Sequence, residues 1–254
     1  MSERKFDTLV TRLQPSVPGC PFPTIMQYVR NSAIRTCERT LYWRHAEAPY
    51  ELTQGVHQYF YKKPASSDVH AVIMATVNSY PLARLTLDKA VEIYPQWADL
   101  YSGIPYEELW GSGGGFNSSA FNELEFNGGP EFKITPKALE KASTPQAITQ
   151  VTPDQFIVLP LPDDNTKYII RLIYALKPKR AAVSMPAYIF DELEDTITHG
   201  ALQELLVLPN VPWSDRELAS YHAKQYSFTI NERRARANLG NVRGSMAAKM
   251  QPFM

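Results

Sequence analysis

The spacing of apolar residues changes twice along this chain of 254 residues. Apolar side chains recur at about every fourth position near the start, alternate with polar ones in the middle, and return to helical spacing after Pro186. The first pattern indicates amphipathic helices and the second indicates half-buried strands. Because helical segments flank the strands, the sequence predicts an α+β fold. We expect a helical bundle built from the N- and C-terminal segments, with an inserted antiparallel β domain and an extended C-terminal tail.

Two helices are predicted before the strands. A short one runs from Phe6 to Leu13 and stops before Pro15, and a longer one covers residues 24–43. The longer helix has an apolar stripe that repeats every four residues, so we interpret Cys37, which lies on it, as a core residue. The members of this stripe are Ile25, Val29, Ala33, Cys37 and Leu41.

A third helix is predicted at residues 186–208, starting at Pro186 and ending before Pro209. Its apolar stripe is costly to leave in water, because burying one Leu or Ile side chain is worth roughly 1.5 to 3 kcal/mol. We therefore expect this helix to pack against residues 24–43, although the whole β domain separates the two in the sequence.

A fourth helix is predicted to begin at Ser214, which forms a capping box with Glu217, and to run to about Gly240. Its apolar residues are interrupted by polar ones and do not form a clean stripe. We therefore expect another subunit to bury part of this helix. The residues in question are Leu218, Tyr221, Gln225 and Phe228.

The middle of the chain predicts a β domain. Residues 50–61 predict a hairpin that turns at Thr53-Gln54-Gly55, and residues 69–87 predict a second strand pair around Asn78-Ser79-Tyr80-Pro81. A short helix is expected at residues 88–94. Further strands are expected at residues 146–151, 155–161 and 167–176.

These patterns give a domain organisation with three boundaries. Residues 1–46 and 184–240 form the discontinuous helical bundle, residues 47–183 form the β domain, and residues 241–254 form the tail. Within the β domain, residues 111–144 are rich in glycine, asparagine and serine. Long segments of this kind are commonly binding loops, so we expect an excursion that protrudes and becomes ordered against a neighbouring protein.

Charge and motifs weigh against several classes of function. The 26 basic side chains balance the 26 acidic ones, so no overall charge recruits nucleic acid or an anionic membrane. Two cysteines are too few for a disulfide scaffold. His45-Ala46-Glu47 matches only the first half of the zinc deaminase motif, and the sequence contains no phosphate-binding loop, GxSxG or HExxH motif. We therefore expect no enzyme, with no catalytic, cofactor-binding or metal-binding residues.

Basic and apolar residues gather at the C-terminal end. Residues 233–254 contain five basic residues and no acidic one. Such a segment can bind nucleic acid phosphates, can dock in a crevice of a protein partner, or can simply be disordered. We expect protein contacts: subunit or portal contacts by Arg233, Arg234 and Arg236, and portal binding by Arg243, Met246, Lys249, Met250, Phe253 and Met254.

Several segments resemble the head-to-tail adaptors of podophages, the group of tail tubular protein A and gatekeeper-like connectors. The resemblance spans most of the chain, but the excursion at residues 111–144 is longer than in that family, so its role is not carried over. The similar segments are Pro18-Gly19-Cys20-Pro21, Arg30 with Ala33, Cys37-Glu38-Arg39-Thr40 with Trp43-Arg44, Phe156-Ile157-Val158-Leu159-Pro160-Leu161-Pro162, and most of residues 199–238, including His199-Gly200-Ala201-Leu202 and Pro212-Trp213-Ser214.

The resemblance implies a structural virion protein of the phage neck. A protein of this family assembles as a twelvefold ring below the portal, contacts tail tube or nozzle proteins beneath, and lets genomic DNA pass through its lumen without sequence-specific binding. It implies no catalytic residue and no cofactor. The first alternative interpretation is a nucleic-acid-binding protein of the phage packaging or replication machinery. A second, less favoured one is a hydrolase whose catalytic residues come together only in the folded protein.

Overall fold

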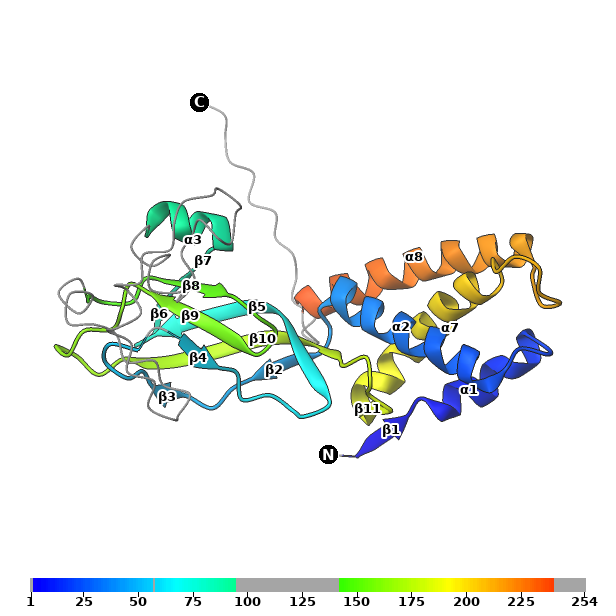
Figure 1. Ribbon diagram of the computed structural model, residues 1–254, viewed down its shortest axis with the longest axis horizontal. Helices are drawn as coiled ribbons and strands as arrows, with labels where there is room; N and C mark the ends of the chain where they lie inside the picture. The colour runs from blue at the N-terminus through cyan, green and yellow to red at the C-terminus, as the bar shows by residue number, and fades with distance from the viewer. Residues whose placement is uncertain (1, 57, 95–141, 240–254) are drawn as a thin grey trace, which may run out of the picture. The chain divides into compact units, whose positions relative to one another are not determined.

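The computed structural model describes residues 2–56, 58–94 and 142–239. The chain divides into two units, which we describe separately (Figure 1). The helical unit comprises Met1–Trp43 and Lys177–Met254, and the β unit comprises Arg44–Leu176. The described residues contain both helices and sheets, which confirms the mixed α+β class. The unit boundaries lie before Arg44 and before Lys177, compared with the expected positions before residues 47 and 184.

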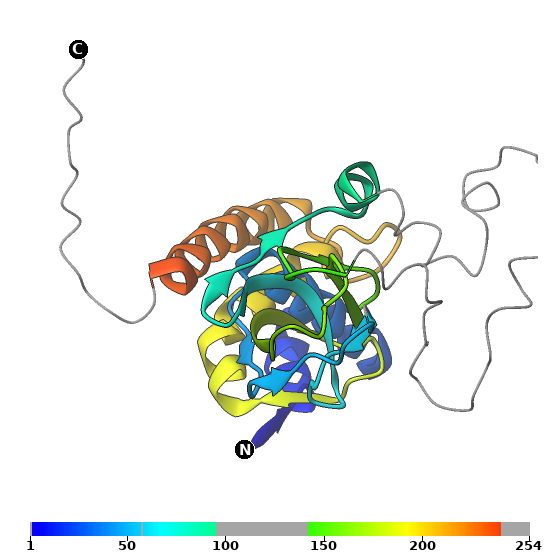
Figure 2. The same ribbon diagram turned by 90° about the vertical axis from the view of Figure 1, so that its left-hand side faces the viewer.

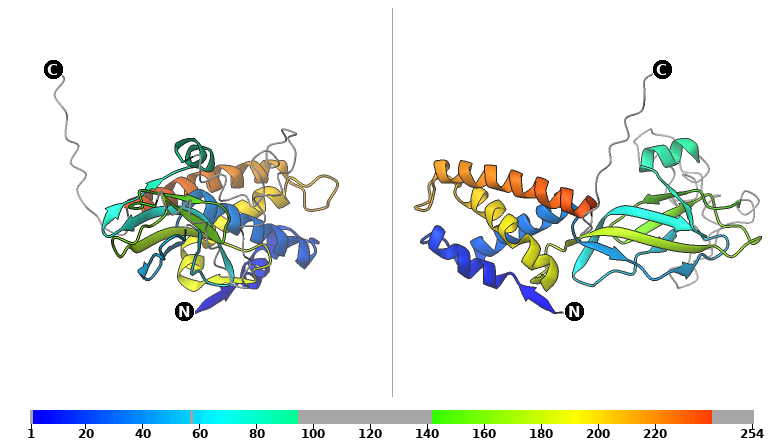
Figure 3. Two further views of the ribbon diagram at one scale, coloured as in Figure 1. Left: turned by 60° about the vertical axis from the view of Figure 1, so that its left-hand side comes forward. Right: turned by 180° about the vertical axis from the view of Figure 1, so that it is seen from behind.

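Two helices form the centre of the helical unit. Helix α7 (Ala187–Leu205) packs against α2 (Phe22–Thr40) and against α8 (Arg216–Leu239). Helix α1 (Asp7–Leu13) lies on the other side, so that α1 and α8 flank the pair α2 and α7 in both Figure 1 and Figure 3. Their facing side chains are fully or almost fully buried, among them Leu9, Ile25, Val29, Cys37, Leu193, Ile197 and Leu205.

Helix α2 ends earlier than the apolar spacing predicts. Leu41 has a φ of 51° and donates its backbone N–H to the carbonyl of Cys37, which closes the last turn in a left-handed conformation. Leu41, the last residue of the predicted apolar stripe, therefore lies just beyond the end of α2. The expected end at residue 43 was too late for this reason.

The start of α8 corrects a second expectation. The side chain of Asp215 accepts a hydrogen bond of 2.9 Å from the backbone N–H of Leu218, so Asp215 is the capping residue. Ser214 instead donates its hydroxyl to the carbonyl of Leu206 at the end of the preceding segment. The predicted capping box from Ser214 to Glu217 is therefore wrong by one residue.

A small sheet in the helical unit was not predicted. Strand β1 (Glu3–Lys5) pairs antiparallel with β11 (Ser184–Pro186), directly before α1 and α7. Three residues on each side are too few to show a recognisable alternation. This sheet ties the start of the chain to the segment that returns from the β unit.

The β unit has two sheets. In the first, the strand order is β2-β10-β5-β6, with β3 also on β10; in the second it is β4-β9-β8-β7. Strand β7 runs parallel to β8, and the other pairs with an established register are antiparallel. The bounds are β2 (Arg44–Ala46), β3 (Tyr50–Glu51), β4 (Gln58–Phe60), β5 (Ser67–Val77), β6 (Tyr80–Pro81), β7 (Ala83–Arg84), β8 (Ala147–Gln150), β9 (Gln155–Leu159) and β10 (Ile169–Pro178).

The hairpin expected at residues 50–61 is not formed. The chain does turn there, because the N–H of Val56 bonds to the carbonyl of Thr53. However, β3 pairs with β10 in the first sheet, whereas β4 pairs with β9 in the second. The turn therefore connects two sheets instead of two neighbouring strands.

The second predicted strand pair, within residues 69–87, forms only in part: β5 pairs with Tyr80–Pro81, which the sequence placed in the turn, whereas β7 pairs with β8 in the second sheet. Asn78 and Ser79 have φ values of 48° and 73°, which is the conformation of a two-residue hairpin turn between β5 and β6. Helix α3 (Leu87–Ile93) follows, with Thr86 as its N-cap. It is the green helix in Figure 2, and its Ala90 packs against Ala147, Ile157 and Leu159 of the second sheet.

Two parts of the sequence prediction fall outside the described residues. The excursion at residues 111–144 does so except for its last three residues. The tail at residues 241–254 does so entirely, with the six residues expected to bind the portal: Arg243, Met246, Lys249, Met250, Phe253 and Met254.

Candidate assembly interface

One side of α8 packs against the rest of the helical unit. Ala219, Tyr226, Ile230 and Ala237 are buried on this side. The Tyr226 hydroxyl lies 3.4 Å from the hydroxyl oxygen of Thr36 on α2, and its ring stacks near the guanidinium of Arg39. These contacts fix how α8 is rotated about its own axis.

The other side of α8 carries exposed apolar side chains. Leu218 is 38% exposed, Tyr221 52%, Phe228 67% and Leu239 54%. On a helix with about 3.6 residues per turn, these positions lie on one side, opposite the four buried residues. We call them the α8 stripe. The apolar residues of α8 do not form one clean stripe in the sequence, because some are exposed on this side and others are buried on the opposite side.

Two of the three arginines singled out in the sequence serve the helical unit itself. Arg233 forms an ion pair of 2.6 Å with Glu192 on α7. Arg236 lies 3.5 Å from Glu192 and 3.1 Å from Glu232. Arg234 is exposed and makes no ion pair within the part of the chain that the structure describes. The basic end of α8 therefore offers less free charge than its sequence indicates.

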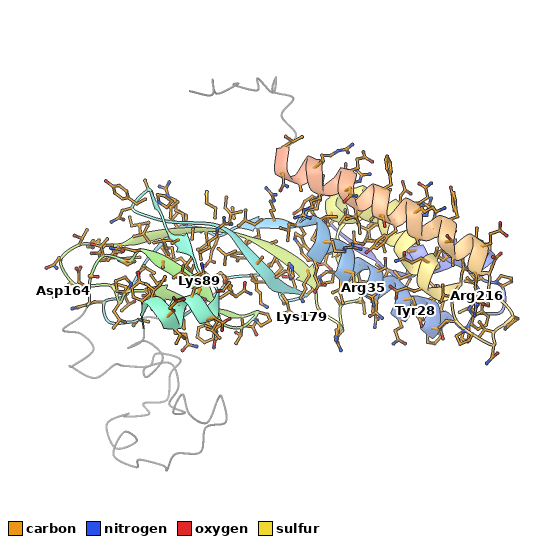
Figure 4. All side chains as sticks on the ribbon, turned by 90° about the horizontal axis from the view of Figure 1, so that it is seen from above. Tyr28, Arg35, Lys89, Asp164, Lys179 and Arg216 are labelled. Carbon is orange, nitrogen blue, oxygen red and sulfur yellow. The ribbon has the colours of Figure 1, made fainter. Side chains whose placement is uncertain are left out.

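A groove of about 950 Å³ follows the exposed side of α2. Its apolar residues come from α2. Its charged residues come from α2 as well, together with Asp7 and Arg180. Arg35 pairs with Glu204 and Glu38 pairs with Lys177, whereas Arg180 and Asp7 make no ion pair among the described residues. Arg35 is labelled in Figure 4. The lining residues are Asp7, Phe22, Pro23, Met26, Gln27, Arg30, Asn31, Ile34, Arg35, Glu38 and Arg180.

Arg30 is the unusual member of this groove. Its Nε atom is buried and has no hydrogen-bond partner among the described residues. A buried donor without a partner costs about 1–3 kcal/mol, and native proteins usually satisfy such groups. The α2 groove is thus a surface with a polar group that an incoming acceptor can satisfy.

Two histidines meet at the contact of α7 with α8. The Nδ1 atoms of His199 and His222 lie 2.8 Å apart, so one ring must donate a hydrogen to the other. Burial lowers the pKa of both rings, and the charge of one lowers that of the other. His199 thus makes a hydrogen bond that joins α7 to α8. Within the described ranges, no group of three or more histidine, cysteine or acidic side chains is placed to hold a metal ion.

A buried acid lies in the β unit. Glu47 is 6% exposed, and both of its carboxylate oxygens lack a hydrogen-bond partner among the described residues. Its neighbours include Tyr50, Tyr61 and Tyr174, but Tyr174 already donates its single hydroxyl hydrogen to the carbonyl of Lys62, at 2.8 Å. Burial raises the pKa of Glu47, and Lys62 partly opposes this. The carboxyl group of Glu47 can therefore hold a proton in the folded protein.

No protein-family model matches the chain, and no related sequence is found among curated proteins. No helix in the described residues is long and apolar enough to cross a membrane. The surfaces of the helical unit are therefore the main guide to function.

Proposed function

We propose that this protein is a structural virion protein, a head-to-tail adaptor that forms a ring between the portal and the tail of a bacteriophage. In this proposal genomic DNA passes through the lumen of the ring, tail tube or nozzle proteins bind beneath it, and the protein acts in the virion neck. The α8 stripe is the observation that carries the proposal. A helix whose exposed side presents two aromatic and two leucine side chains is typical of a surface that another protein covers.

The helical unit supports the same proposal. It is assembled from both ends of the chain, with the β unit inserted between them, as the resemblance to the adaptor family implies. Helices α2, α7 and α8 contact one another and form one packed body that can repeat around a ring.

The tail at residues 241–254 is proposed to anchor the ring to the portal. Its apolar residues Met246, Met250 and Phe253 supply adaptable anchors, while Arg243 and Lys249 set register and encounter rate. In a twelvefold ring even weak anchors are repeated, and linked contacts can raise avidity by about 10² to 10⁴.

Co-sedimentation with portal particles tests this function. The full chain is expected to join the portal as a ring that electron microscopy resolves, and truncation after Gly240 is expected to leave a folded protein that no longer joins. A matched variant with Arg243 and Lys249 replaced by Ala separates charge from apolar anchoring. If the full chain does not associate with any portal of its own phage, the proposal is wrong.

The same samples test the nucleic-acid alternative. Arg233 is held by Glu192 through a partly buried ion pair of 2.6 Å, which weighs against phosphate binding by this arginine. DNA affinity that falls steeply with salt and is lost when Arg234 and the tail cations are removed would instead support that alternative.

A further inference from the structure

We infer that the α8 stripe of one copy packs along the α2 groove of the next copy, so that the ring closes by a contact between two different faces of the helical unit. The inference rests on the proposed ring and names the surfaces that join its subunits. It is carried by the positions of the two surfaces, by their lengths, by their apolar composition and by their charges.

The two surfaces lie on different sides of the same unit. The α8 stripe faces away from α2 and α7, because the buried residues of α8 lie on its opposite side. The groove involves the exposed side of α2 together with Asp7 at the start of α1, and α1 and α8 flank the central helix pair in Figures 1 and 3. A contact between two different faces of each copy is heterologous, and such contacts generate rings when the rotation closes.

The α8 stripe is long enough to cover the groove. From Phe22 to Glu38 the groove follows α2 for about 24 Å, at a rise of about 1.5 Å per residue. From Leu218 to Leu239 the stripe covers about 32 Å by the same measure. Helix α8 can therefore lie along the whole groove.

Apolar groups meet in this arrangement. Phe22 is 46% exposed at one end of the groove, and Ile34 and the largely buried Met26 continue the apolar part along α2, between polar and charged lining residues. Tyr221 and Phe228 are more than half exposed on the stripe. Aromatic side chains that meet a small apolar centre within a polar surround are typical of a protein interface.

The charges are complementary as well. The groove holds two cations without an ion pair among the described residues, Arg180 and Arg30, and the Nε of Arg30 is buried and unsatisfied. Two carboxylates border the stripe, Glu217 before Leu218 and Glu232 one turn after Phe228. Among the described residues Glu232 pairs with Arg236 of its own helix, through an exposed ion pair of 3.1 Å that contributes little stability and is easily exchanged.

Cross-linking between differently labelled copies tests the contact. One full-length protein carries Phe228→Cys and a second carries Gln27→Cys or Asn31→Cys, both of which line the groove. The native cysteines Cys20 and Cys37 are buried and do not interfere. The two proteins are mixed, assembled with portal and treated with a short bismaleimide. A mixed dimer is expected, with little product from either protein alone.

A matched control lies on the same helix. Ser227 is exposed but points away from the stripe, so Ser227→Cys mixed with Gln27→Cys is expected to give at least about tenfold less mixed dimer, a factor that corresponds to about 1.4 kcal/mol. Phe228→Glu in the full chain is expected to lower the assembled fraction by a similar factor without changing the unfolding midpoint.

The possible outcomes separate the inference from the proposed function. Rings that form on the portal without cross-links between positions 228 and 27 or 31 overturn the inference and leave the adaptor function standing. Efficient dimers of the Phe228→Cys protein alone indicate stripe-to-stripe pairing and overturn it too, as does equal cross-linking of the Ser227→Cys control. If no ring forms with portal, the inference falls together with the proposed function.

Discussion

Gly200 of α7 lies so close to Tyr226 of α8 that a Cβ atom on the glycine would come within 2.7 Å of the tyrosine Cε2 atom. The same Cβ would collide with the hydroxyl oxygen of Ser32 on α2, which donates a hydrogen bond of 2.7 Å to the carbonyl of Ile197. Gly200 of α7 therefore lies in close contact with both α2 and α8, with no room for a larger side chain.

Gly200→Ala is expected to destabilise the helical unit by about 1–3 kcal/mol, because forcing extra volume into a packed contact exceeds the helix propensity gained from alanine. Denaturant unfolding followed by circular dichroism measures the change. Ser227→Ala on the exposed side of α8 is the control and is expected to stay within about 0.5 kcal/mol of the unchanged protein. A Gly200→Ala protein as stable as the parent would contradict the tight contact of the three helices at Gly200.

Leu193→Ala or Leu205→Ala is expected to cost about 2–5 kcal/mol. Both side chains are fully buried on α7, where it packs against its neighbours. Leu218→Ala, on the exposed stripe of α8, removes the same atoms from a position that is 38% exposed and is expected to cost far less in the isolated chain. Equal losses at the buried and exposed positions would mean that α7 does not form the centre of the unit.

The sequence predicted the elements better than their partners. Apolar spacing located α2, α7 and β10 and correctly paired the first two, because a stripe of buried residues is encoded locally. Apolar spacing could not show that β3 and β4 belong to different sheets. A turn such as that at Gly55 has the same sequence pattern whether it connects two paired strands or two strands of different sheets. Strand pairing depends on distant residues that local spacing does not specify.

The candidate interface was predicted in part. The sequence pointed to α8 as a helix that another subunit covers, and the structure locates its exposed apolar residues on one side. It could not foresee that Arg233 is already held by Glu192, because the two residues come from different helices. The meeting of His199 with His222 was missed for the same reason, since neither histidine has a local partner pattern.

The stability of the helical unit is expected to fall as the pH is lowered from about 7 to 5. The pKa values of His199 and His222 are lowered from their ordinary value of 6.5, chiefly by burial, while Asp195 opposes and Arg12 reinforces the effect at His199. A lowered pKa gives stability that is complete above 6.5 and is lost as the pH falls through the folded value. Unfolding midpoints at several pH values measure this.

His222→Gln is the matched variant for the histidine pair. It keeps a polar side chain beside His199 but removes one of the two titrating groups, so the midpoint is expected to depend less on pH over the same interval. His45→Gln, in the β unit, serves as the control and is expected to keep the slope. An unchanged slope in the His222→Gln protein would show that the pair does not titrate during unfolding.

The β unit is expected to respond to pH in the opposite direction through Glu47. Burial raises the pKa of this carboxyl above its ordinary value of 4.5, which means that folding favours the protonated form. The stability that Glu47 contributes is complete below 4.5 and is lost as the pH rises through the folded pKa. At neutral pH the folded β unit therefore carries either a buried charge or a proton that the unfolded chain does not hold.

Glu47→Gln is accordingly expected to raise the stability of the β unit at pH 7 to 8 and to leave it nearly unchanged near pH 4, where the native carboxyl is already neutral in the folded state. The amide has nearly the same shape, so the packing around Tyr61 and Tyr174 is retained. Glu51→Gln on β3, where the side chain is exposed, is the control and is expected to show no such pH-dependent gain. Thermal or urea unfolding, followed by tyrosine fluorescence, compares the three proteins across this range. A glutamine variant that is less stable than the parent at pH 8 would show that the ionised carboxylate is satisfied in solution, by water or by Lys62, and that Glu47 stabilises the unit as a charge.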